Sequence, residues 1–141
     1  EGINTCFAAR SLGSPHDSEE IVGASVAWIL ENHPQEFDLE MAHTNYPYDY
    51  NNAMNILLCQ ELAQYNHLLG CIKTSLKDIQ RAAAGTVVKS EKLEAIEEAI
   101  GFGRVPEVWL RRSYLTTKPL SQYTADLTKR VNFFRGWLEA Q

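Results

Sequence analysis

Residues 51–85 read NNAMNILLCQELAQYNHLLGCIKTSLKDIQRAAAG. Apolar side chains recur in this stretch at alternating steps of four and three residues, which is the period of one face of an α-helix. The stripe consists of Leu58, Leu62, Tyr65, Leu69, Ile72, Leu76, Ile79 and Ala83. Leu57, Leu68 and Cys71 widen it, and so wide an apolar face is typical of a helix packed in a bundle. The sequence therefore predicts one long helix, over about residues 51–84, as the centre of the fold.

The end of this helix is marked by Gly85. Glycine adopts the left-handed backbone conformation that closes many helix C-termini, so Gly85 is suited to that position. Arg81 lies in the preceding turn, where a positive charge interacts favourably with the helix dipole.

Shorter helices are expected on both sides of the long one. They cover about residues 17–32, 38–43, 91–100, 106–110 and 121–140. The expected N-terminal capping residues are Asp17, Asp38, Asp49 and Ser90. The expected inward residues are Ile21, Val22, Ser25, Trp28, Ile29, Leu93, Ile96, Ile100, Tyr123, Leu127, Val131, Phe134 and Leu138. Because no stretch alternates with the period of a strand, the sequence predicts an all-α helical bundle with short loops and no substantial sheet.

The amino-acid composition limits the kinds of partner that the protein is expected to bind. The 141 residues are 45% hydrophobic and 22% charged, which is ordinary for a globular protein. The net charge is −5, and no basic cluster is longer than Arg111-Arg112, so we expect neither a nucleic-acid partner nor binding to an anionic membrane. No apolar run approaches the roughly 20 residues that span a bilayer, and no signal peptide is recognisable.

The motifs of common active sites are missing from the sequence. There is no GxxxxGK[ST] phosphate loop, and the glycines at 101–103 follow a predicted helix, which they would end. The histidines at positions 16, 33, 43 and 67 lack the spacing of metal ligands, and His67 is expected on a helix surface. The four glutamates between residues 91 and 98 are interpreted as a solvated helix face, and Asp126 with Arg130 as a surface pair.

Three cysteines occur, at positions 6, 59 and 71. Cys59 and Cys71 are twelve residues apart on one predicted helix, about 18 Å along its axis, too far to form a disulfide within it. Reduced structural thiols are therefore expected. The sequence predicts no catalytic, cofactor-binding or metal-binding residue, and thus a polypeptide that is not itself an enzyme.

Five motifs follow one another in an order that resembles the dynein heavy chain, of the axonemal type, near the end of its motor region. The first two resemble YPxxYxxSMNTVLxQE and RxNxLLxxIxxSL, with matches at Tyr46-Pro47, Tyr50, Met54-Asn55, Leu58, Gln60-Glu61, Asn66, Leu68-Leu69, Ile72 and Ser75-Leu76. The next two resemble GxVVMSxxLE and GxVPxxW, with matches at Gly85, Val87-Val88, Ser90, Leu93-Glu94, Gly103, Val105-Pro106 and Trp109. The last resembles SYPSLKPLGxxxxDLxxRxxFFxxW, with matches at Ser113-Tyr114, Lys118-Pro119-Leu120, Asp126-Leu127, Arg130, Phe133-Phe134 and Trp137. The sequence departs from these patterns at Ala53, Ile56, Gln64, Lys89, residues 115–117 and Ser121.

This resemblance implies a non-catalytic structural segment of a microtubule-based, ATP-driven motor. Such heavy chains have a ring of six AAA+ modules, a linker and a stalk with a microtubule-binding tip. Residues 1–50 would belong to the helical small (lid) subdomain of the sixth module, and residues 51–141 would begin the C-terminal region. The segment would help to close the ring and to couple ring changes to the linker and stalk.

The resemblance also implies cofactors, partners and a location. ATP and magnesium would bind only in other modules of the parent protein. The partners would be the rest of the heavy chain, a microtubule through the stalk, and dynein intermediate or light chains. The location would be the cytoplasmic cytoskeleton, in the axoneme of a cilium or flagellum.

A second interpretation is a free-standing helical adapter that uses the helix at 51–85 as a partner groove. It explains the bundle and the acidic surface equally well, but it leaves the order of the motifs as a coincidence.

Overall fold

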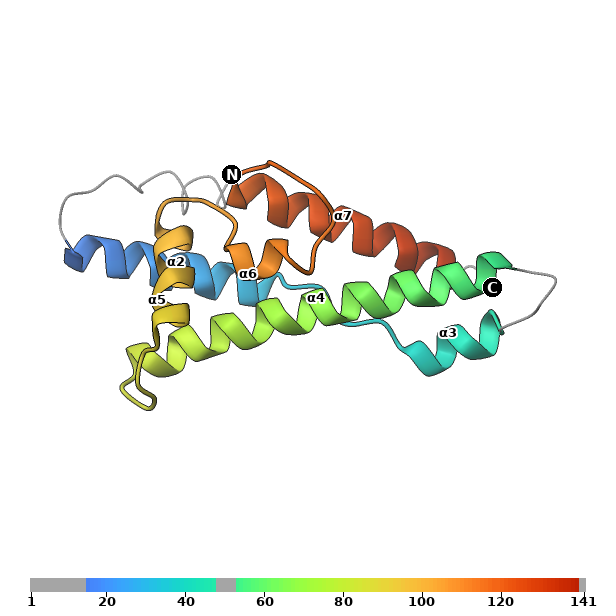
Figure 1. Cartoon of the computed structure of the whole chain (residues 1–141), viewed down its shortest axis with the longest axis horizontal. Coiled ribbons are helices and arrows are strands. Elements are labelled where there is room, and N and C mark those ends of the chain that lie inside the picture. Colours follow the sequence, from blue (N-terminus) through green and yellow to red (C-terminus); the bar gives the residue numbers. More distant parts are fainter. Residues whose placement is uncertain (1–14, 48–52, 140–141) are drawn as a thin grey trace.

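The protein is an elongated helical bundle in the computed structural model, which describes residues 15–47 and 53–139, with side chains from residue 20 onward. The helices are α2 (Pro15–Glu31), α3 (Leu39–Asn45), α4 (Ala53–Ala83), α5 (Glu91–Gly101), α6 (Glu107–Leu110) and α7 (Leu120–Glu139) (Figure 1). Within these described ranges the regular elements are all helices and no strand occurs. The all-α prediction is confirmed.

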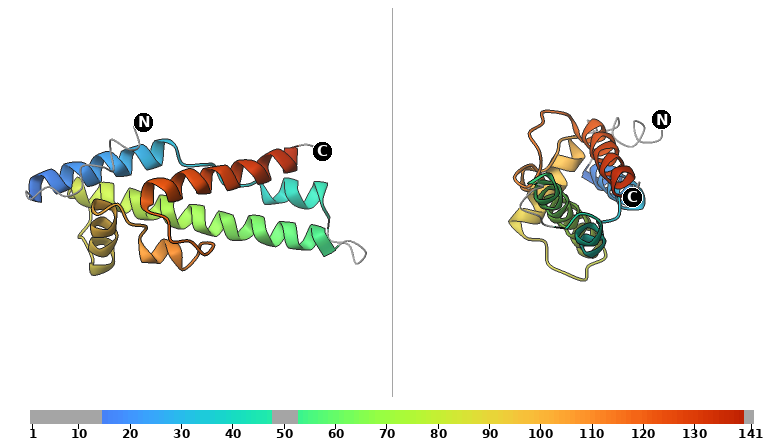
Figure 2. Two further views of the ribbon diagram at one scale, coloured as in Figure 1. Left: turned by 90° about the horizontal axis from the view of Figure 1, so that it is seen from above. Right: turned by 90° about the vertical axis from the view of Figure 1, so that its right-hand side faces the viewer.

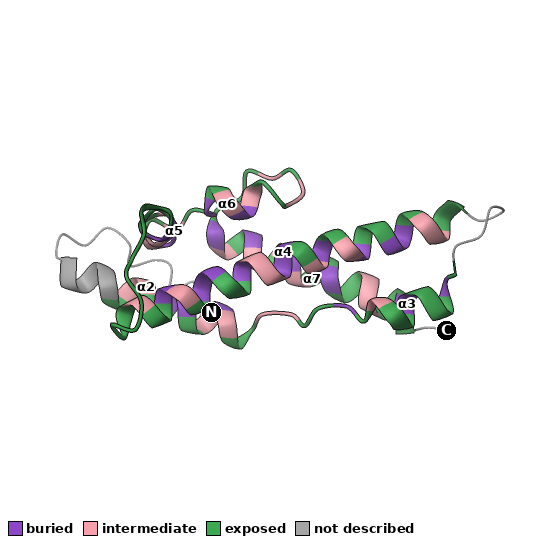
Figure 3. Ribbon diagram, turned by 60° about the horizontal axis from the view of Figure 1, so that its bottom comes forward, coloured by how far each residue is buried: buried purple, intermediate pink, exposed green. Residues whose placement is uncertain are grey.

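Helix α4 is the axis of the molecule. It has 31 residues, about 46 Å of helix, and its buried inward stripe runs from Leu58 to Ile79 (Figure 3). Seven of the eight predicted stripe positions are buried, namely Leu58, Leu62, Tyr65, Leu69, Ile72, Leu76 and Ile79. The eighth, Ala83, is exposed, so the buried stripe ends one turn before the helix does.

The prediction that Leu57 lies on the inward face of α4 is wrong. Leu57 is 57% exposed, whereas Cys59 is buried and its Sγ donates to the carbonyl of Tyr46 at 3.8 Å. The reason is the position of α3, which packs on α4 and whose C-cap residue Tyr46 covers the side of α4 that carries Cys59. Leu68 is buried and Cys71 is half-buried, as expected.

The helix ends are closed largely by the predicted residues. The backbone N–H of Met41 donates to Asp38, and that of Leu93 donates to Ser90, so both capping predictions are confirmed. Gly85 has φ +81°, and the N–H of the following residue bonds to Arg81 at 2.9 Å, which is the Schellman closure of α4. Helix α2 begins at Pro15, two residues before the predicted cap Asp17, because proline is well suited to a first helical turn. Asp49 lies outside the described residues.

The other helices pack on both sides of α4. In the view from above, α2, α3 and α7 lie on one side of it, and α5 and α6 lie on the other (Figure 2). Helices α2 and α7 follow one another along α4, and α5 crosses its C-terminal part steeply, in contact with both α2 and α4 (Figure 1).

One hydrophobic core connects these elements. Its most buried members come from several helices and include Val26, Leu62, Trp109, Tyr123 and Leu138. The core also crosses the predicted division at residue 50, since the ring of Phe37 contacts that of Tyr65 edge-on at 6.5 Å. The division itself stays a prediction.

The inward positions of the shorter helices agree with the prediction in most places. The three predicted residues of α5 are buried, as are Tyr123, Leu127, Val131 and Leu138 of α7. Phe134 is half-buried, and α2 buries Val26, which the prediction omitted, while Ile21 and Val22 are only half-buried. The glutamates of α5 are not all on a solvated face, because Glu97 is half-buried and its Oε1 pairs with Lys89 at 2.9 Å.

Candidate functional site

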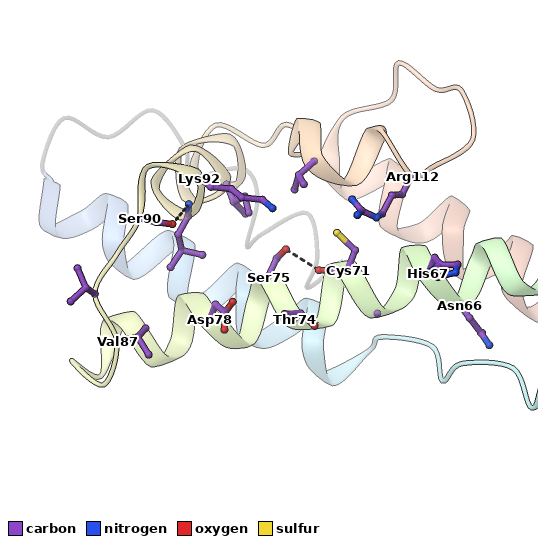
Figure 4. Close-up of a pocket in the computed structure, with 15 residues that line it drawn as sticks. Asn66, His67, Cys71, Thr74, Ser75, Asp78, Val87, Ser90, Lys92 and Arg112 are labelled. Atoms are coloured by element: carbon purple, nitrogen blue, oxygen red, sulfur yellow. Dashed lines mark hydrogen bonds between the residues drawn. The ribbon is translucent and has the colours of Figure 1, made fainter.

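A groove of about 640 Å³ opens between α4, α5 and α6. Its walls also include the loop before α5 and Arg112 in the turn after α6 (Figure 4). The lining residues are Asn66, His67, Gly70, Cys71, Thr74, Ser75, Asp78, Val87, Val88, Ser90, Lys92, Leu93, Ile96, Val108 and Arg112. A concave surface of this size is within the range of about 300–1,000 Å³ that is typical of binding clefts.

The lining of the groove combines apolar walls with a polar floor. Leu93 and Ile96 of α5 and Val108 of α6 provide apolar surface, and Val88 at the edge is 94% exposed. On α4 the hydroxyl of Ser75 donates to the carbonyl of Cys71 at 2.8 Å, and the Cys71 thiol is directed into the groove (Figure 4). The groove can therefore accept an apolar group, with the thiol close to it.

Two cations stand at the opening of the groove. Lys92 of α5 and Arg112 after α6 extend towards it, and both are exposed (Figure 4). Within residues 20–47 and 53–139, neither of them has an acidic partner. Two nearby cations do form ion pairs: Lys89, three residues before Lys92, pairs with Glu97, and Arg111 pairs with Glu107. Neither Lys92 nor Arg112 therefore has its charge neutralised by an ion pair within the described part of the protein.

The position of Arg112 depends on a hydrogen-bonded connector, residues 111–119. Its organising group is the Asp126 carboxylate, which accepts from the Tyr114 hydroxyl at 2.9 Å and pairs with Lys118 at 3.1 Å and Arg130 at 2.9 Å. The Arg130 guanidinium also lies 3.7 Å from the centre of the Tyr114 ring. The predicted Asp126–Arg130 pair is confirmed, but the sequence does not indicate the two contacts from the connector.

These contacts change proton affinities. The hydrogen bond from Arg130 is the main cause that lowers the pKa of Asp126 to about 2, with Tyr114 and Lys118 adding to it and desolvation opposing it. Burial, followed by the hydrogen bond to Asp126, raises the pKa of Tyr114 well above its ordinary value. Tyr123 stacks on Tyr114, donates to the Ser113 hydroxyl at 2.7 Å, and has its pKa raised to about 12 by burial. The connector is thereby held by neutral tyrosines around one ionised carboxylate.

A second set of bonds holds the segment between α2 and α3 against α4. The Nε2 atom of His33 lies 2.9 Å from the carbonyl oxygen of Leu69, and Asn66 bonds to the backbone of Phe37. Burial is the main cause that lowers the pKa of His33 below its ordinary 6.5. The segment on the far side of α4 is therefore fixed by the same helix that forms the groove floor.

The histidines and cysteines examined as possible metal ligands or nucleophiles do not form a cluster among the described residues. His67 is exposed, as predicted, and among the side chains described no group of three His, Cys, Asp or Glu residues is placed to hold a metal ion. Cys59 and Cys71 are free thiols, and burial raises the pKa of Cys59, which keeps it protonated. Cys6 and the side chain of His16 lie outside the described residues. The absence of a catalytic or cofactor site stays a prediction.

None of the helices in the part of the chain that the structure describes combines the length and the apolar character needed to cross a bilayer.

Comparison with known proteins places the sequence in a family. The model of the family described as the C-terminal domain of the dynein heavy chain matches residues 3–141. The sequence is 36% identical to human dynein axonemal heavy chain 12 over 129 residues, which are 92% of this chain and 4% of that protein. It is 37% identical to human dynein axonemal heavy chain 3 over 139 residues, which are 99% of this chain and 3% of that protein. It thus spans about 3–4% of the length of these relatives. The protein belongs to the family of C-terminal domains of dynein heavy chains.

Proposed function

We propose that this chain is a structural, non-catalytic segment of a dynein heavy chain in an axonemal, microtubule-based motor driven by ATP. The observation that carries the proposal is the family match over residues 3–141, together with relatives named as axonemal heavy chains. ATP and magnesium bind in AAA+ modules elsewhere in the parent protein. The location is the cytoskeleton of a cilium or flagellum.

The mechanical part of the proposal is that the segment helps to close the AAA+ ring and to couple ring changes to the linker and stalk. A helix of 31 residues with a stripe of buried side chains is suited to transmit displacement without bending. At its N-terminal end the apolar side chains of Met54 and Leu57 are 66% and 57% exposed. Exposed apolar side chains of this kind are suited to contact neighbouring parts of a ring.

The proposal also divides the chain into two parts at residue 50. Residues 1–50 form part of the small subdomain of the sixth module, and residues 51–141 begin the C-terminal region. The partners are the neighbouring modules and linker of the heavy chain, the microtubule through the stalk, and intermediate or light chains. The packing of Phe37 on Tyr65 supports mechanical continuity across the division.

The test uses the intact heavy-chain motor. Met54→Asp with Leu57→Asp places two carboxylates on exposed positions of α4 without entering the core of this segment. We expect the microtubule stimulation of ATP hydrolysis to fall severalfold, while hydrolysis without microtubules stays unchanged. Leu115→Asp, at a position that is 100% exposed on the connector, is a control that adds one carboxylate away from α4, and it should leave both rates unchanged. Unchanged stimulation in the double variant would contradict the coupling role.

The family assignment of the native protein has its own test. An antibody against residues 51–81, used on a denaturing gel of ciliated-cell extract, should detect a very large polypeptide that fractionates with axonemes. A band near the 15.9 kDa of this chain would instead support the free-standing adapter.

A further inference from the structure

We propose that the groove between α4, α5 and α6 binds an acidic polypeptide segment from elsewhere in the same heavy chain. The inference rests on the proposed function, because it takes the occupant from the rest of the parent protein. It adds to that function a particular contact surface and the chemistry of the segment that fills it.

The two positive charges at the opening of the groove favour binding of carboxylates. Lys92 and Arg112 approach the opening from opposite walls, and neither is paired within the described residues (Figure 4). In a protein with net charge −5, two cations without an ion-pair partner that face one concave surface are suited to an acidic partner. On the groove wall formed by α4 the acidic residue Asp78 is already paired with Arg81 at 3.2 Å, so it adds little repulsion.

The apolar walls favour a polypeptide over a phosphate or a nucleic acid. Leu93 and Ile96 are core residues whose edges reach the groove, and Val87 and Val88 expose branched apolar side chains beside it. A simple anion would leave this apolar surface uncovered, whereas a nucleic acid would need a basic face much larger than two side chains. A segment with one apolar side chain between two carboxylates would cover the walls and neutralise both cations.

The thiol of Cys71 provides a direct readout of occupancy. It is half-buried and directed into the groove, so a docked segment would shield it from an alkylating reagent (Figure 4). In the intact heavy-chain motor we expect slow alkylation of Cys71, measured by mass spectrometry of its peptide. Lys92→Glu with Arg112→Glu should repel the segment and accelerate alkylation at least about tenfold. Lys92→Arg with Arg112→Lys should keep it slow.

A charge reversal outside the groove controls for a general effect of net charge. Lys77→Glu with Lys129→Glu makes the same change of net charge at exposed positions of α4 and α7 that are not among the groove-lining residues, and it should leave the alkylation rate of Cys71 unchanged. Equal acceleration in this control and in the groove variant would contradict docking. Rapid alkylation of Cys71 in the unaltered motor would also overturn the proposal.

The identity of the occupant is read by zero-length crosslinking. A carbodiimide couples the Lys92 amine to a neighbouring carboxylate, and sequencing of the joined peptide identifies its partner. A partner peptide from the same heavy chain supports the inference, and one from a separate polypeptide overturns the proposed source. An open groove in a motor that still loses microtubule stimulation with the Met54 and Leu57 variants would refute this inference alone and leave the proposed function standing.

Discussion

The side-chain amide of Asn66 bonds to both backbone polar groups of Phe37. The Phe37 N–H donates to Oδ1 of Asn66 at 2.7 Å, and Nδ2 of Asn66 donates back to the Phe37 carbonyl at 3.0 Å. Phe37 belongs to no helix, so its backbone N–H and carbonyl have no partners within a regular element. The side chain of Asn66 on α4 supplies both hydrogen bonds. With the His33 contact to Leu69, this bond pair fixes the path between α2 and α3.

Asn66→Ala should therefore lower the free energy of unfolding by about 1–3 kcal/mol, because it leaves both polar groups of Phe37 without partners. Asn66→Asp keeps the acceptor but loses the donor, so an intermediate loss is expected. Asn55→Ala is the matched control, since Asn55 makes one exposed bond to Pro47, and it should cost less than Asn66→Ala. Chemical denaturation followed by circular dichroism measures all three, and equal losses for Asn66→Ala and Asn55→Ala would contradict the special role of Asn66.

The features that the sequence predicts correctly are those with a local signal. The stripe of α4 follows from spacing within one helix, and the caps at Asp38 and Ser90 follow from residues next to the helix they close. On one flank of α4 the buried residue is Cys59 and not the predicted Leu57, which shows the limit of such signals. An amphipathic pattern gives the centre of a buried face, but the position of α3 decides which flank is covered.

The groove could not be predicted from local sequence patterns, because it depends on how separate elements pack. Cys71, Lys92 and Arg112 lie on three separate elements, and only the steep crossing of α5 over α4 and the turn after α6 bring them to one surface. The contact of Asn66 with Phe37 spans 29 residues and is unpredictable for the same reason. At Asp126 the bond to Arg130 is predictable from their spacing along one helix, whereas Tyr114 and Lys118 reach it from an irregular connector.

Two glycines should respond to alanine with opposite signs. Gly85 closes α4 at φ +81°, where a Cβ is strained although no neighbouring atom obstructs it, so Gly85→Ala should cost about 1–2 kcal/mol. Gly136 lies inside α7 with open space around its Cβ position, so Gly136→Ala should gain about 0.5–1 kcal/mol. Thermal denaturation of the two variants measures both effects, and a shared sign would contradict the assigned roles.

Asp126→Asn should destabilise the 111–119 connector. It removes the charge that attracts Lys118 and Arg130, and because those cations are about half exposed we expect a loss of only about 1–2 kcal/mol. The lowered pKa of Asp126 means that its contribution is present above about pH 4 and is lost as the pH falls towards 2. Asp78→Asn, in an exposed pair with Arg81, should cost less than about 0.5 kcal/mol. Denaturant titrations at pH 7 and pH 2.5 test this, since the difference between wild type and Asp126→Asn should shrink at the lower pH.

His33 should make the stability of the fold sensitive to mild acid. Burial lowers the pKa of His33 in the folded protein below the 6.5 of the unfolded protein, so near and below pH 6.5 the unfolded state binds more protons. The free energy of unfolding should consequently be highest above pH 6.5 and decrease as the pH falls towards 5. His33→Gln retains a donor for the Leu69 carbonyl but has no titrating ring, so this decrease should flatten. His67→Gln, at an exposed position on α4, should retain it. Denaturant titrations between pH 5 and 8 compare the three proteins, and an undiminished acid step in His33→Gln would assign the sensitivity to another group.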